Sequence, residues 1–335
     1  MNAALPEWHG PTPVGLSAPA MRWWHLELSH RLLDDLHLPT PGSLGALYRS
    51  VFGLALHERA PHLFERFAGE QSDAPRPWWL WPTDLADDTC VPAGAVLNVR
   101  LGLHTSALPE LAACLQAFED FERHGLGAQR SRLRLEAVRW LTPQGPVPLH
   151  SPDDAQHPPT PWQADDVWRS ARAELTAGQG GALWVQTVTP LRLKVASRLV
   201  TEPPPLSVLL LGCFMRLGVL LTLSREPGEA GQVPPAWLSD AEKAPWLGWS
   251  RCLLPDLAWT QRAQVHRWSS RQQRAIRMDG LAGAWAYPSE ACAALPWLRL
   301  GEHLQLGGKT TVGMGAFHIH IGGPASSILT SQIAA

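Results

Sequence analysis

The segment Leu306-Gly307-Gly308-Lys309-Thr310-Thr311-Val312-Gly313-Met314-Gly315 lies near the C-terminus, between a predicted helix and a predicted strand. Apolar residues from Glu290 to Leu306 recur at helical spacing, and residues from Gly315 to Ile321 alternate as in a strand. A glycine cluster leaves backbone N–H groups free to approach phosphates, and Lys309 adds a positive charge. A nucleotide-binding P-loop follows a strand and precedes a helix, which is the reverse order. The segment therefore predicts a phosphate contact of a different kind.

The same order of elements occurs twice along the chain. The first half has apolar patterns for a strand at 21–28, a helix at 43–59, strands that include 96–103, a helix at 108–123 and a strand at 132–138. The second half has them for a strand at 184–194, a helix at 207–223, strands at 259–268 and 280–287, and then the helix and strand described above. Two βαββαβ units predict an α+β protein with tandem ferredoxin-like domains, the RRM-like fold.

The predicted domains cover residues 21–141 and 183–322. Between them, residues 142–182 are rich in Pro, Gly, Asp and Gln, which indicates a linker that holds one short helix. Residues 1–20 and 323–335 are predicted to be loose tails.

Composition excludes several classes of protein. The chain has 335 residues, of which 45% are hydrophobic and 17% charged, with a net charge of -2, so we expect a globular protein. The longest apolar run, 206–223, is interrupted by Arg216, which favours a buried helix over a membrane span. The five cysteines are widely spaced and form no Cys-x-x-Cys pair, which argues against zinc or a disulfide framework. We expect a cytoplasmic protein without a metal site or a cofactor.

Five stretches, in this order along the chain, carry a resemblance to a known family. They are Gly42–Gly53, Gly125–Arg130, Val188–Lys194, Trp268–Gln273 with Gly280–Gly283, and Pro296–Leu304 with Gly308–Gly315. Together they resemble the CRISPR repeat-processing endoribonucleases of the RAMP superfamily. The resemblance spans both predicted domains, and no single motif carries it alone.

The resemblance implies two ferredoxin-like domains that bind CRISPR repeat RNA and cleave precursor crRNA without a metal ion. The expected products carry a 2′,3′-cyclic phosphate and a 5′-OH, because the ribose 2′-OH attacks the neighbouring phosphate. Further expected partners are other CRISPR effector subunits. No membrane and no direct contact with DNA is expected.

Candidate catalytic residues follow from the family, whose histidine lies at or just beyond the end of the first helix, often with a tyrosine on that helix. This implies Tyr48, His57, His62 and the intervening Arg59. Tyr48 and His57 would lie about 180° apart on an ideal helix. Pro61 indicates that the helix ends near there, which places His62 just past its end. His57 and His62 remain alternatives, and His37, before the helix, is a third. Each of them could instead be a surface histidine without a catalytic role.

Candidate RNA-binding residues are basic, amide or glycine positions within the family-like stretches. Arginines that alternate on one strand face could give that face a positive charge, although each could equally be a solvated surface residue. The full set is Gly307, Gly308, Lys309, Thr310, Thr311, Gly313, Gly315, Arg267, Arg271, Gln272, Arg130, Arg132 and Lys194.

Two other functions fit the same patterns. A RAMP subunit that holds crRNA in an effector complex without cutting it would need the same fold and loop, because fold does not determine function. An unrelated tandem ferredoxin-like protein that binds a small ligand is the other alternative. Cleavage of repeat RNA in EDTA separates the first of these from an enzyme, and failure to bind structured RNA at low salt would favour the second.

Overall fold

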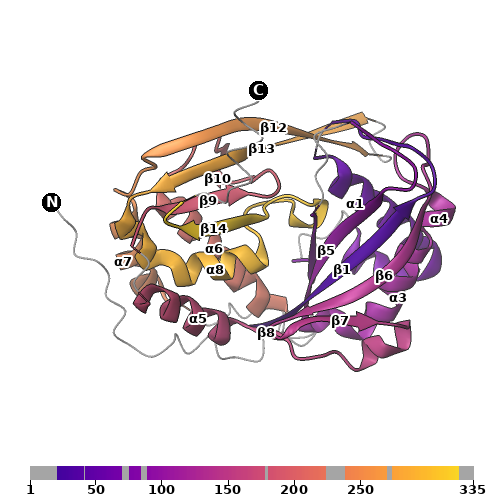
Figure 1. Ribbon diagram of the computed structural model, residues 1–335, viewed down its shortest axis with the longest axis horizontal. Coiled ribbons are helices and arrows are strands. Elements are labelled where there is room, and N and C mark those ends of the chain that lie inside the picture. Colours follow the sequence, from indigo (N-terminus) through magenta and orange to yellow (C-terminus); the bar gives the residue numbers. More distant parts are fainter. Residues whose placement is uncertain are drawn as a thin grey trace.

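Two α+β halves lie side by side in the computed structural model of the chain (Figure 1). The structure describes residues 21–40, 42–69, 75–83, 89–177, 180–223, 238–269 and 274–323. Of the predicted tails, residues 1–20 and 324–335 lie outside the described residues.

The first half is built on an antiparallel sheet with the strand order β3-β5-β1-β6-β7. In chain order its main elements are β1 (Arg22–Leu32), α1 (Leu44–Arg59), β3 (Trp78–Pro82), β5 (Val96–His104), α3 (Leu111–Glu119), β6 (Leu133–Thr142) and β7 (Gly145–Leu149). The first strand, β1, lies between β5 and β6 and is antiparallel to both. This βαββαβ order with a central first strand is the ferredoxin-like arrangement, as predicted.

Prolines determine where the helices of this half begin and end. Helix α1 ends at Arg59 and α2 (Pro61–Phe67) starts at the proline, so the predicted helix end is confirmed. The single helix predicted at 108–123 is instead a 3₁₀ helix, α3 and α4 (Phe121–His124). The 3₁₀ helix η3 (Thr105–Glu110) contains Pro109, which has no N–H to donate to a helical bond. A short pair, β2 (Leu36–His37) and β4 (Cys90–Val91), lies outside the main sheet.

The second half repeats the arrangement with the strand order β12-β13-β9-β14. Its elements in chain order are β9 (Leu183–Thr187), β10 (Lys194–Val195), β11 (Arg198–Leu199), α6 (Leu206–Leu223), α7 (Asp240–Ser250), β12 (Leu257–Ser269), β13 (Arg274–Tyr287), η5 (Ser289–Ala294), α8 (Leu295–Leu304), η6 (Thr310–Val312) and β14 (Phe317–Ile321). The first strand of this half, β9, again lies between the third and the fourth. Both predicted ferredoxin-like units are therefore present.

The strand predicted at 184–194 is wrong beyond Thr187. Pro190 has no backbone N–H, so it cannot take part in a regular ladder. After it, Leu191 pairs with Leu281 only as an isolated bridge, and the chain then turns into the small β10–β11 hairpin. This departure from the sheet brings Arg192 and Lys194 next to the glycine-rich segment, since Gly308 N donates to Arg192 O.

Residues 142–182 connect the two halves and contain more regular structure than one helix. They include β7, η4 (Pro152–Gln156), β8 (Trp162–Gln163) and α5 (Ala164–Thr176). Strand β8 pairs with the start of β1 in the first half. Helix α5 packs on α8 in the second half, where the rings of Trp168 and Trp297 lie 4.2 Å apart. The segment therefore contacts both halves.

The two halves share an apolar core. Trp23 and Trp79 project from the first sheet and are fully buried in the same cluster as Trp285 and Trp297 of the second half. Indole rings bury large apolar surfaces, which makes such contacts a main source of stability. These tryptophans therefore fill the core, and the contact between the two halves is part of that same core.

Helix α6 is long and apolar enough to cross a membrane, with a mean hydropathy of 2.2. In the structure one side of it covers the second half: Leu209, Cys213 and Leu217 are fully buried. Its opposite side, with Leu211 and Met215, is exposed.

A second contact between the halves lies at the far end of the long β12–β13 hairpin, which reaches towards α1 (Figure 1). A small buried cluster joins the hairpin, α1 and the glycine-rich segment. Its members are Ala46, Val265, Met278, Val312 and Met314. The glycine-rich segment is thus held between an element of each half.

Buried His30 on β1 predicts acid-sensitive stability. Burial lowers its pKa to about 4, although a contact of Nε2 with Phe118 O opposes the shift. Below pH 6.5 the unfolded chain takes up a proton that the folded chain does not, so stability is lost as the pH falls towards 4. At pH 5 the loss from His30 is about 2 kcal/mol, at ~1.4 kcal/mol per pH unit.

Urea unfolding at pH 7.5 and pH 5 measures this effect. The variant His30→Gln, which cannot titrate, is expected to lose about 2 kcal/mol less than the wild type between the two pH values. The exposed-site control His150→Gln should lose as much as the wild type. Equal losses in wild type and His30→Gln would contradict the assignment.

Candidate functional site

The glycine-rich segment lies directly against the first turn of α1. A methyl group on Gly45 would lie 2.6 Å from Val312 O and 2.8 Å from Gly313 Cα. Gly315 has φ +93° and its backbone is so close to Leu306 O that a Cβ would lie 2.1 Å away. Only glycine fits such positions, because L-residues avoid positive φ and no side-chain atom fits at that distance. The glycines thus allow the segment to pack tightly on α1 and its two ends, Leu306 and Gly315, to lie against each other.

Only the first part of the segment faces the solvent. Gly307, Gly308 and Lys309 are exposed, whereas Thr310, Gly313 and Gly315 are buried and Thr311 is partly buried. Lys309 has a left-handed backbone, with φ 72°.

A groove of about 320 Å³ opens beside this exposed part, and we call it the basic groove. Arg192, Lys194 and Arg216 line it together with Gly307 and Gly308. The apolar side of α6 forms its other wall, and none of the described residues that line it is acidic. A groove with three cations and exposed glycine backbone suits an anionic chain such as a phosphate backbone.

The charge of Arg216 is held deep in the basic groove. Its Nε donates to Leu304 O at 2.8 Å, and its guanidinium carbon lies 5.0 Å from the centre of a Trp79 ring. Burial lowers the pKa of Arg216 to about 10, so it remains charged at neutral pH. Among the described residues, no hydrogen-bond partner meets its buried Nη2. A buried cation that lacks a carboxylate partner favours binding of an external anion.

The predicted catalytic residues lie around the other end of α1. His57 is exposed on the last turn, with its ring 4.9 Å from that of Phe64, and His62 is exposed on α2. Arg59 donates two hydrogen bonds of 2.9 Å to Asp120. From Gly45 to His57 a helix rises about 18 Å. The histidines and the glycine-rich segment are therefore at opposite ends of α1.

Two other predicted positions differ from these in their surroundings. Tyr48 is fully buried in the apolar core of the first half, with its ring 5.4 Å from that of His30, so an RNA cannot contact it unless that core opens. His37 is exposed on β2, which precedes α1 in the chain.

Acidic side chains pair with two of the three arginines that were expected to give β6 and its preceding turn a positive face. Arg132 binds Asp34 through two side-chain hydrogen bonds, and Arg134 binds Glu122 in the same way. Arg130 is exposed in the turn, with a left-handed backbone at φ 53°. The ion pairs offset the charges of Arg132 and Arg134.

Three other predicted RNA-binding positions lie in or next to β12 along the chain. Arg267 lies on β12, with its side chain outside the described residues. Arg271 and Gln272 follow β12 in the sequence and lie outside the described residues.

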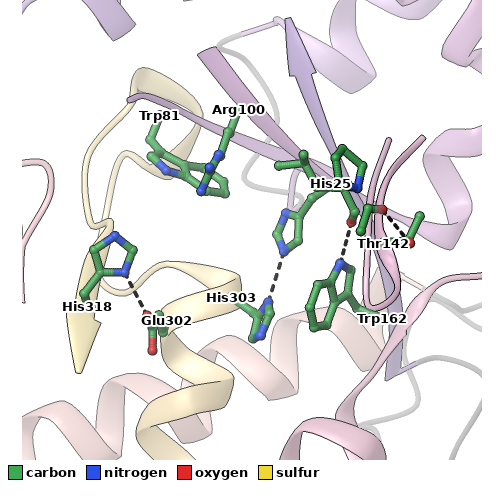
Figure 2. A pocket seen from close by; sticks show the side chains of 11 residues that line it. His25, Trp81, Arg100, Thr142, Trp162, Glu302, His303 and His318 are labelled. Carbon is green, nitrogen blue, oxygen red and sulfur yellow. Dashed lines mark hydrogen bonds and ion pairs between the residues drawn. The ribbon is translucent and has the colours of Figure 1, made fainter. Parts of the chain in front are cut away.

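A second pocket, of about 310 Å³, lies between the first sheet and the elements α8 and β14; we call it the interdomain pocket (Figure 2). His25 of β1 and His303 of α8 meet at its base, with Nε2 and Nδ1 3.3 Å apart. Trp23 Nε1 donates to His25 Nε2 at 3.1 Å, so a neutral His25 carries its proton on Nδ1. Burial lowers the pKa of both rings, that of His303 to about 4, which keeps the pair neutral near pH 7.

An ionised carboxylate faces the same pocket. Glu302 accepts from Arg299 at 2.8 Å and lies 2.8 Å from His318 Nδ1. Burial opposes its ionisation, but these two partners together hold its pKa below the usual value. Arg100 lies across from it on β5, with Nε 3.4 Å from Glu27 (Figure 2).

The interdomain pocket was not predicted from the sequence. His25 and His303 are separated by 278 positions, and no spacing rule links residues so far apart. The only sequence signal was that both are polar residues within apolar patterns.

Comparisons with known proteins match both halves of the chain. Residues 185–317 match the family model of the CRISPR-associated endoribonuclease Cas6. Residues 58–161 match a second family model, described as an N-terminal domain. No curated protein sequence matches the chain.

Solved structures share the fold over most of the chain. Cas6 of Thermus thermophilus is 16% identical, with a TM-score of 0.51, over 89% of this chain and 98% of that one. Its product complex gives 17% identity and a TM-score of 0.52 over 90% and 100% of the two chains. A partial Cas6-RT-Cas1–Cas2 complex is 10% identical, with a TM-score of 0.57, over 90% of this chain and 46% of that one. At such identities the likeness shows a common fold.

Proposed function

We propose that this chain, whose residues 185–317 match the family model of the CRISPR-associated endoribonuclease Cas6, binds CRISPR repeat RNA and cuts precursor crRNA without a metal ion. The observation that carries the RNA-binding part is the basic groove. It combines the exposed glycines Gly307 and Gly308 with three cations, which suits a phosphate backbone.

The proposed cleavage is a transfer of the phosphate to the neighbouring ribose oxygen. A base removes the proton of the 2′-OH, the 2′ oxygen attacks phosphorus, and the bond to the 5′ oxygen breaks. An acid donates a proton to that leaving oxygen. The products are then a 2′,3′-cyclic phosphate and a 5′-OH, and nearby cations stabilise the extra negative charge of the transition state.

We assign the base and acid roles to His57 and His62, which are exposed at the junction of α1 and α2. Histidine suits both roles because its ordinary pKa lies near neutral pH. Arg59 lies between them along the chain and would contribute charge, although Asp120 holds its guanidinium. Tyr48 has no part in this proposal, because it lies in the core.

A subunit that holds crRNA without cutting it is the alternative. The observation that favours it is the length of α1 between the glycine-rich segment and the two histidines. Both functions need the basic groove, and only the enzyme needs the histidines.

The deciding experiment incubates the wild-type chain with its own repeat RNA in EDTA. We expect a single cut per repeat, with a cyclic phosphate on the upstream product and a 5′-OH on the downstream one. RNA that stays intact while bound would leave the binding subunit as the function. RNA that neither binds nor is cut would overturn both.

The basic groove predicts a defined change in salt dependence. For single-stranded nucleic acid, each phosphate contact contributes about 0.7 to the slope of log affinity against log salt. We therefore expect Lys194→Gln to reduce that slope by about 0.7, and the double variant with Arg192→Gln by up to about 1.4.

Filter binding at several salt concentrations measures the slope. Lys243→Gln is the matched control, because Lys243 lies on α7 and pairs with Asp240. Its slope should equal that of the wild type. An unchanged slope in the Lys194 variant would remove that residue from the RNA path.

A further inference from the structure

The interdomain pocket differs in chemistry from the basic groove. The groove is lined by cations and no described acid, whereas the pocket combines the ionised Glu302 with the cation Arg100 and the neutral pair His25 and His303. Glu302 and Arg100 present one charge of each sign to the pocket, and Glu302 is already paired with Arg299 and His318. Such a lining suits a largely neutral ligand that has both donors and acceptors better than it suits a phosphate.

Aromatic rings give the pocket flat apolar walls. Trp162 of β8 is partly exposed, and its Nε1 donates to Leu141 O at 2.7 Å, which fixes the orientation of the ring. Trp81 of β3 closes the other side, next to Arg100 (Figure 2). Aromatic faces that are held rigid are the usual platforms on which unpaired bases stack.

Polar groups stand at the rim of these walls. Figure 2 shows Arg100 and Trp81 on one side of the pocket and Glu302 and His318 on the other. A guanidinium donates to acceptor atoms of a base edge, and a carboxylate accepts from its amino or imino groups. His318 is nearly half-exposed and can reach a ligand as well.

The size of the pocket limits what can enter. About 310 Å³ is at the lower end of the ~300–1,000 Å³ found for small-molecule sites, so one base with its sugar fits and a longer segment does not. The pocket opens next to the face of the first sheet that carries Glu27, where Arg100 and Arg139 flank this residue. A chain that crosses this face can place one nucleotide in the pocket.

We propose that the interdomain pocket binds a single unpaired nucleobase of the bound RNA, stacked on Trp162 and recognised through Arg100 and Glu302. This inference rests on the proposed RNA-binding function and adds base recognition to it. The basic groove holds the backbone, and the interdomain pocket reads one base from surfaces of both halves.

The test uses the repeat RNA with 2-aminopurine at each unpaired position in turn. Stacking on an indole quenches this probe, so we expect quenching at one position with the wild type and its loss with Trp162→Leu. We also expect Trp162→Leu to bind the unmodified RNA about 10-fold more weakly, which equals about 1.4 kcal/mol. Trp162→Phe keeps a ring and should retain most of the affinity.

An RNA that lacks the base at the quenched position makes the test independent of how the variant folds. With the wild type this abasic RNA should bind about 10-fold more weakly, and with Trp162→Leu it should bind like the intact RNA. Trp259→Leu is the control: this exposed ring lies on β12, outside both sites, and its removal should change neither quenching nor affinity.

Three outcomes would overturn the proposal. One is the absence of any position at which quenching depends on Trp162. Another is an equal effect of abasic RNA on wild type and variant at every position. The last is displacement of the quenched base by millimolar AMP or GMP without loss of RNA affinity, which would make the pocket a free-nucleotide site. Each can occur while the wild type still cuts its repeat, so failure here is distinct from failure of the proposed function.

Discussion

Replacing both His57 and His62 by alanine is expected to lower the rate of repeat-RNA cleavage by about 10²–10⁴-fold, the range for loss of general acid–base catalysis. Both side chains are exposed, and neither packs in the core, so the fold should be unaffected. RNA affinity should stay within about twofold, because the proposed backbone contacts lie in the basic groove. Single-turnover cleavage in EDTA, with affinity measured separately, distinguishes these two effects.

The single variants show which histidine acts. If one single variant retains the full rate and the other equals the double variant, the second is the catalytic residue. His150→Ala is a matched control on an exposed loop and should cut at the wild-type rate. Full activity in the double variant would contradict the assignment, and His37→Ala would then be the next variant to measure.

Substituting Gly45 by alanine is expected to destabilise the protein, the opposite of its usual effect in a helix. An interior glycine replaced by alanine normally stabilises a helix by about 1 kcal/mol. Here the new methyl group would lie within 2.6–2.8 Å of backbone atoms of Val312 and Gly313. Overpacking costs about 1–3 kcal/mol, and backbone cannot swing aside as a side chain can, so we expect a net loss of about 2 kcal/mol.

The same change should also weaken RNA binding, because the glycine-rich segment must shift to make room. Gly248→Ala on α7 is the matched control, since a Cβ there would meet nothing within 4 Å. It should stabilise the protein by about 1 kcal/mol and leave RNA affinity unchanged. Urea unfolding and RNA binding of both variants measure the contrast. A stability gain at Gly45 would mean that the segment does not rest on α1.

Most of the fold could be predicted from hydrophobic periodicity, because both ferredoxin-like units consist of long, regular patterns. The errors occurred where a proline interrupts the chain. Pro109 lies within the 3₁₀ helix that precedes α3, and Pro190 follows soon after the end of β9 at Thr187, although the pattern predicts a strand as far as Lys194. A missing N–H changes the hydrogen bonding of its neighbours, which an apolar pattern does not reveal.

The candidate site could be predicted only in part. The glycine-rich segment was visible because its chemistry is contiguous in the chain. Burial was not visible: Tyr48 fits a catalytic pattern in the sequence but fills the core. The ion pairs of Arg132 and Arg134 could not be predicted either, because their partners Asp34 and Glu122 lie far from them along the chain or in another element.

Two ferredoxin-like units and a glycine-rich connection between α8 and β14 can be predicted from the amino-acid sequence, since helix, strand and turn preferences are local. Which side chains meet follows from the way the elements pack. Arg192, Lys194 and Arg216 converge on the basic groove because the chain leaves the sheet at Pro190 and α6 packs alongside. His25 meets His303 because the first sheet, which contains β1, packs against helix α8 of the other half. Such meetings depend on packing between distant elements, which local patterns do not encode.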